Sequence, residues 1–143
     1  METIQERERE RYMSAVKPSM DPPQTSTNTY RIGPDDAQKF PVIEGRQMVE
    51  NVLEERLSGF QYDAKSAGDV CKGIADAVTS RAKHLGCDRH RFICHAAMFS
   101  KVGQAVKSVS RFLWDQKSDN HVTCTYESKD FSVAVSLYAL YFE

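Results

Sequence analysis

Four residues in the middle of the chain have the types and spacing of a metal site. Cys87, His90, Cys94 and His95 form the pattern Cys-x-x-His-x-x-x-Cys-His, and thiolate and imidazole are the ligands that Zn²⁺ prefers in a tetrahedral site. Apolar residues alternate along 91–99, however, which predicts a strand whose neighbouring side chains point to opposite faces. Cys94 and His95 then cannot bind one ion, so we expect no metal.

Nucleophilic catalysis needs a Cys or Ser beside a positioned base. Cys71 lies on the apolar face of a predicted helix, where a thiol is typically inert packing. His84 falls at the end of that helix, where a cation interacts favourably with the dipole. His121 begins a predicted strand without an evident acid partner, and Gly103 is too isolated for a phosphate-binding loop. The residues predict a protein that is not an enzyme and needs no cofactor.

The charge balance and the hydropathy pattern exclude two classes of partner. The 19 Lys and Arg residues against 20 Asp and Glu residues leave no broad basic surface for nucleic acid. No apolar run approaches the ~18 residues that a membrane-spanning helix needs. The first residues lack the basic start and apolar stretch of a signal peptide. We therefore expect a cytoplasmic protein with reduced cysteines, bound neither to nucleic acid nor to membrane.

Residues 1–29 differ in composition from the rest of the chain. Charges alternate over 6–11, and 17–28 is mostly Pro, Ser, Thr and other polar residues. Such a segment buries too little apolar surface to offset the entropy of ordering it. It is either a solvated, flexible arm or a tether that orders on a partner. Residues 30–143 form the predicted domain.

Two helices open this domain. Residues 42–57 carry apolar side chains at helical spacing, after Phe40-Pro41 and before Ser58-Gly59. Residues 64–85 also carry apolar side chains at helical spacing, with Asp63 as the predicted N-cap and Gly86 as the residue after the helix end.

After Gly86 the pattern alternates with a period of two residues. It predicts four strands, at 91–99, 105–114, 121–127 and 131–142. Separate groups of helices and strands predict an α+β fold, with two helices packed on a four-stranded antiparallel sheet. The last strand carries apolar residues on both faces, and two helices can cover only one of them. A subunit interface is the expected cover for the second face.

Three segments of the chain resemble Tctex-type dynein light chains. The similar segments are Ser110-Arg111-Phe112-Leu113-Trp114-Asp115 followed by Asp119-Asn120, the ending Tyr138-Ala139-Leu140-Tyr141-Phe142-Glu143, and Arg89-His90-Arg91-Phe92. Asn28-Thr29-Tyr30-Arg31, with Pro34 and Lys39-Phe40, is similar to the opening of the Tctex-two-like branch of ciliary dyneins. Phe112 stands where Cys is common, and Gly103-Gln104-Ala105 replaces the usual Gly-x-Gly.

The resemblance implies a strand-exchanged dimer, in which each sheet is completed by the second strand of the other chain. It implies a non-catalytic subunit that binds the dynein intermediate chain, another Tctex-type light chain as a homo- or heterodimer, and other dynein subunits. The Asn28-Thr29-Tyr30 opening favours a motor of the ciliary or flagellar axoneme, part of the cytoskeleton. The alternative is a cytoplasmic dynein light chain, or a motor-independent adaptor of the same fold.

The predicted partner-binding element is the second strand, because the middle of that strand is small and polar and an exchanged edge can pair with an added peptide. Its residues are Ala105, Val106, Lys107, Ser108, Val109, Ser110, Arg111, Phe112 and Leu113. Trp114 is either an interface anchor or a residue at the edge of the core. Asp115 and Asn120 are expected to shape the following turn through side-chain to backbone hydrogen bonds.

Overall fold

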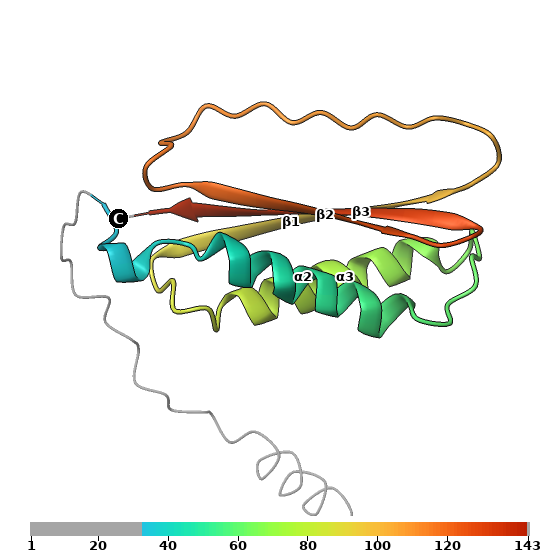
Figure 1. Ribbon diagram of the computed structural model, residues 1–143, viewed down its shortest axis with the longest axis horizontal. Helices are drawn as coiled ribbons and strands as arrows, with labels where there is room; N and C mark the ends of the chain where they lie inside the picture. Colours follow the sequence, from blue (N-terminus) through green and yellow to red (C-terminus); the bar gives the residue numbers. More distant parts are fainter. Residues whose placement is uncertain (1–32, 143) are drawn as a thin grey trace, which may run out of the picture.

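The computed structural model describes residues 33–142, so the predicted arm at 1–29 lies outside the described residues. Two helices, α2 (Val42–Leu57) and α3 (Ala67–Ala82), lie against one face of an antiparallel sheet (Figure 1). A short 3-10 helix, η1 (Asp36–Gln38), precedes them. The face that packs on the helices is called the inner face below, and the opposite one the outer face.

The predicted bounds of the first helix are confirmed, and those of the second are too wide. Helix α3 begins at Ala67 and ends at Ala82, and its N-cap is Ser66 and not Asp63. The Asp63 carbonyl instead accepts the N–H groups of Ser66 and Ala67, at 3.2 and 3.0 Å, in a turn that leads into the helix. At the other end, a turn reaches Gly86, whose φ of +82° is the left-handed conformation expected there.

Three strands form the sheet in the order β1-β3-β2: β1 (His90–Ser100), β2 (Asn120–Glu127) and β3 (Phe131–Tyr141). A short turn at 128–130 joins β2 to β3, and in it the Ser128 N–H donates to the Phe131 carbonyl at 2.9 Å. The last strand of the sequence is thus the central one. Helix α3 packs under β1, and α2 packs under β2.

The core lies between the helices and the inner face. Alternate residues of β3 point into it, as the period of two predicts. The largest side chains that are fully buried are Phe131, Leu53, Leu57, Ile74, Leu137, Val49, Val52, Val78, Val122, Val133 and Val135. No helix within residues 33–142 is long and apolar enough to cross a bilayer.

The predicted second strand, 105–114, is not a strand in the single chain. Residues 105–114 belong to a long connection, 101–119, that leaves β1 and passes over the outer face to reach β2 (Figure 1). We call residues 101–119 the crossing segment. Its extended backbone has no adjacent strand to pair with, and a ladder needs a neighbour about 4.8 Å away. The single chain therefore supplies a three-stranded sheet.

Candidate functional site

The crossing segment holds an unpaired stretch of backbone. Lys101 still donates to the Asp130 carbonyl at 2.9 Å, as a continuation of the β1–β3 ladder. Beyond it, residues 103–114 make no backbone-to-backbone hydrogen bond with any part of the chain that the structure describes. Backbone groups of this kind must be satisfied by water or by another chain.

The start of the crossing segment is a turn built by Gln104. Its side-chain amide donates to the Ser100 carbonyl at 2.6 Å and its Oε1 accepts the Val102 N–H at 3.3 Å. Gly103 supplies the left-handed backbone, with a φ of +88°. No other type of residue between 33 and 142 has a positive φ, so Ala105 is unstrained although the usual motif has Gly there.

The end of the crossing segment is held by two carboxylates. Asp115 accepts the Lys117 N–H at 3.0 Å and the Ser118 hydroxyl at 3.1 Å, and these bonds, the backbone one first, lower the pKa of Asp115. Asp119 accepts the Asp115 N–H at 3.1 Å and the Tyr141 N–H at 2.8 Å. Asp119 thus ties the segment to the end of β3, a role that nothing in the local sequence pattern indicated.

Four aromatic rings join the crossing segment to the outer face. Phe112 stacks on Trp114 with ring centroids 4.1 Å apart, and it lies 5.3 Å from the ring of Tyr138 on β3. His121 on β2 lies 5.7 Å from Trp114. The Ser110 hydroxyl is 3.0 Å from that of Tyr138. Trp114 is half-buried in this cluster, which holds the C-terminal part of the crossing segment near the sheet.

Before this aromatic cluster, the crossing segment is separated from the sheet. Two cavities, about 640 and 250 Å³, separate it from the outer face, and Ser108 lines both. Val109 is 77% exposed and Leu113 is 103% exposed, so its outward apolar side chains face solvent. Apolar residues clustered on an unpaired extended segment mark an interaction surface.

The free edge of β2 is the nearest place where a strand can be added. Ser128 bonds to Phe131 across the β2–β3 turn, so even-numbered residues of β2 face β3 and the odd-numbered ones direct their backbone groups outward. Two side chains cover part of this edge. Arg46 of α2 donates to the Thr123 carbonyl at 3.2 Å, and the Asn120 amide oxygen accepts the His121 N–H at 2.9 Å.

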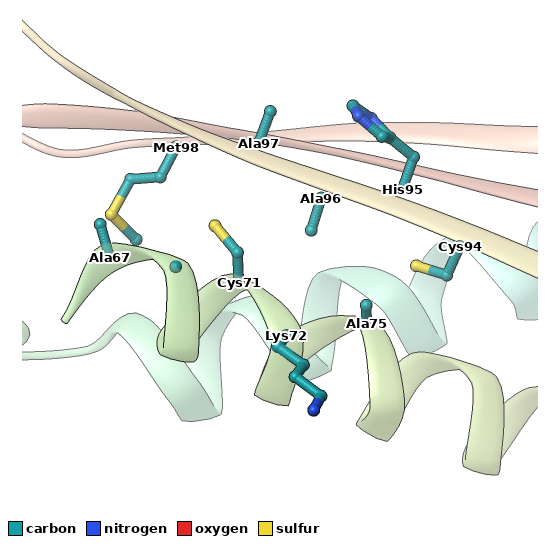
Figure 2. Close-up of a pocket in the computed structure, with 10 residues that line it drawn as sticks. Ala67, Cys71, Lys72, Ala75, Cys94, His95, Ala96, Ala97 and Met98 are labelled. Carbon is teal, nitrogen blue, oxygen red and sulfur yellow. The ribbon is translucent and has the colours of Figure 1, made fainter.

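The thiols show no sign of reactive chemistry. All four cysteines are free, and burial raises the pKa of each, that of Cys94 to about 11. Cys94 points toward α3 whereas His95 points to the other side of the sheet, as the alternation predicted (Figure 2). Among residues 33–142, no three His, Cys, Asp or Glu side chains converge well enough to hold a metal ion.

The fold and this site define a small α+β protein with an unpaired strand-like segment beside an open sheet edge. Residues 39–140 match the Tctex-1 family. The chain belongs to this family of dynein light chains, which is non-catalytic.

Individual relatives carry the same designation. The chain is 28% identical over 118 residues to dynein light chain Tctex-type protein 2B of Danio rerio, covering 82% of this chain and 79% of that protein. It is 31% identical over 116 residues to the human dynein light chain Tctex-type protein 2, covering 81% of this chain and 58% of the human protein. The mouse dynein light chain Tctex-type 4 is 24% identical, over 85% of this chain and 55% of its own length.

Proposed function

We propose that the protein is a light chain of a ciliary or flagellar axonemal dynein, a dimeric subunit that binds the intermediate chain in the motor's tail. Residues 30–143 carry this role in the cytoplasm and on the cytoskeleton. The observation that supports it most is the unpaired backbone of residues 103–114 above an open sheet edge. The similarity to Tctex-type proteins 2 and 2B and the Asn28-Thr29-Tyr30-Arg31 opening favour the axonemal motor.

In the proposed dimer, residues 105–113 of each chain leave their own outer face and pair with β2 of the partner. The exchange adds a fourth strand to each sheet and covers the exposed Val109 and Leu113. The partner is a second copy of this chain or another Tctex-type light chain. The cavities support this, because the middle of the crossing segment has few contacts with its own sheet to lose. The contacts that Ser110 and Phe112 make with Tyr138 break in the exchange.

Strand geometry separates the residues that dimerise from those that dock a further peptide. The odd-numbered residues of β2 direct their backbone outward and their side chains to the outer face. In an added strand, the residues that bond to these positions of β2 place their side chains on the same outer face. Ser108 and Ser110 already lie over the outer face. In the dimer, the N–H groups of Ser108 and Ser110 therefore bond to β2. The N–H groups of Lys107, Val109 and Arg111 point to the new edge, where an intermediate-chain segment adds as a strand.

A pair of proline variants tests this assignment. Proline removes one ladder donor, so Ser110→Pro is expected to abolish the dimer, whereas Arg111→Pro is expected to keep the dimer and lose the intermediate chain. Sedimentation velocity measures the first effect, and co-purification of the intermediate chain from a ciliary extract measures the second. A wild-type chain that stays monomeric at all concentrations, alone and with Tctex-type partners, contradicts the exchange.

The axonemal assignment has its own test. Mass spectrometry of native complexes captured with the full chain is expected to recover axonemal dynein heavy and intermediate chains. Recovery of cytoplasmic dynein subunits, or of no motor subunit, overturns it. Ser110→Pro serves as the control for capture that does not depend on the dimer.

A further inference from the structure

A groove runs along the edge of the sheet opposite to β2, between β1 and the first half of α3. Its volume is about 530 Å³, and most of the residues that line it are Ala, Gly or Cys, beside the longer Lys72, His95 and Met98. Figure 2 shows the Cys71 thiol pointing up toward β1, and Met98 and Cys94 pointing down toward α3. Lys72 points away from the sheet, so its charge stays outside the groove.

The backbone of β1 beside this groove is an open ladder. Lys101 donates to Asp130, and Phe142 donates to Arg89 at 2.9 Å, so the odd-numbered residues of β1 face β3. The even-numbered ones direct their N–H and carbonyl groups outward. The two ends of this edge are occupied, since the His90 N–H donates to Cys87 and the Ser100 carbonyl accepts Gln104. Between them, residues 92–98 have no edge partner in the described part of the chain.

We propose that residues 25–29 of the same chain occupy this edge as an added antiparallel strand. Thirty-two residues precede Gly33, the first described position. Gly33 lies beside Ser118, with 3.9 Å between the Ser118 hydroxyl and the site of a Cβ on Gly33. The Ser118 carbonyl in turn is 3.3 Å from Nε2 of His90, the first residue of β1. The described chain therefore begins near the end of the sheet where β1 starts, and an added strand that continued from there along this edge would run antiparallel to β1.

Residues 25–29 match the edge of β1 in length, and their side chains match the groove in size. From Thr29 to Gly33 an extended chain covers about 13 Å, the same as β1 from Cys94 back to His90. Residues 25–29 then lie opposite 94–98. Thr25, Thr27 and Thr29 share one face of such a strand. They are β-branched and small, which suits both a strand and a groove lined by Ala, Gly and Cys. Pro22-Pro23 ends the pairing.

This docking is independent of the dimer proposed above, because β1 and β2 are opposite edges of the sheet. It also gives a role to the edge of β1, which strand exchange at β2 does not involve. The ends of the edge are closed by the protein's own groups, while its middle is open over the length that residues 25–29 can fill.

Hydrogen exchange in the full chain tests the proposal. The N–H groups of Cys94, Ala96 and Met98 are expected to exchange at least tenfold more slowly than free amides, and Thr27→Pro is expected to remove this protection by deleting a donor toward β1. Ser14→Pro is the matched control and is expected to keep it. Both substituted positions precede Gly33, and the core residues of the described chain lie between Phe40 and Ala139, so neither substitution alters a core side chain.

Three outcomes overturn the proposal. Amides of 94–98 that exchange freely in the wild-type chain show an empty edge. Protection that rises with protein concentration identifies a second copy as the occupant. Protection that survives Thr27→Pro, or is lost equally in Ser14→Pro, excludes residues 25–29. As a second readout, alkylation of Cys71 is expected to be several-fold faster in Thr27→Pro than in Ser14→Pro, because the thiol points into the groove.

Discussion

The carboxylate of Asp119 accepts the backbone N–H of Tyr141 at 2.8 Å, although 22 positions separate the two residues. The same side chain accepts the N–H of Asp115 at 3.1 Å. One acidic residue therefore connects the end of the crossing segment to the end of the central strand. This connection keeps the crossing segment attached at its C-terminal end while its middle remains unpaired.

Replacing Asp119 is expected to destabilise the fold at this junction. Asp119→Ala leaves the N–H groups of Asp115 and Tyr141 without their acceptor, at a cost of about 2 kcal/mol in the free energy of unfolding. Asp119→Asn keeps one oxygen acceptor and is expected to lose less. Urea unfolding measures both. Asp130→Ala, in the exposed β2–β3 turn, is the control, and an equal effect there contradicts the special role of Asp119.

Two glycines in the helices are expected to respond in opposite directions to the same substitution. A Cβ on Gly45 of α2 comes within 2.6 Å of the buried Phe40 ring, so Gly45→Ala forces a rearrangement costing about 1–3 kcal/mol. A Cβ on Gly73 of α3 meets only the Arg56 side chain at 3.7 Å. Gly73→Ala is therefore expected to stabilise the helix by up to about 1 kcal/mol. Thermal unfolding distinguishes the two, and stabilisation by Gly45→Ala would refute the packing described.

The stability is expected to fall in alkaline solution, in part because of Cys94. Burial, and secondarily Asp76, raises the pKa of this thiol from 9.0 to about 11. Above pH 9 the unfolded chain loses the thiol proton while the folded chain keeps it, so the free energy of unfolding falls until about pH 11. Urea unfolding of Cys94→Ala over this range is expected to show a shallower fall. Parallel curves for the variant and the wild type contradict the assignment.

The edge of β2 is expected to accept a strand more readily when Arg46 is removed. Its guanidinium occupies the Thr123 carbonyl, which an exchanged strand needs as an acceptor. Arg46→Ala is therefore expected to strengthen dimerisation roughly fivefold, the value of one ordinary hydrogen bond. Sedimentation equilibrium measures this, with Arg56→Ala on the same helix as the control. A weaker dimer for Arg46→Ala alone indicates that Arg46 binds the incoming strand instead.

Local patterns in the sequence determined most of the secondary structure. The apolar spacing over Val42–Leu57 places the first helix at its observed bounds, and the alternation after Gly86 places β1, β2 and β3 within a residue at each end. These signals are short-range, because helical and extended backbones repeat every 3.6 and 2 residues. The bounds of α3 were less accurate, since the apolar spacing continues into the turns on either side of it.

The tertiary structure alone decided which backbone remains unpaired. Residues 105–114 alternate like the other strands, yet a strand exists only where a neighbour completes its ladder, and the sheet order β1-β3-β2 leaves them without one. The contacts of Asp119 with Tyr141 and of Arg46 with Thr123 join residues far apart in the chain. No local period encodes such pairs, because they depend on how the finished layers bring distant segments together.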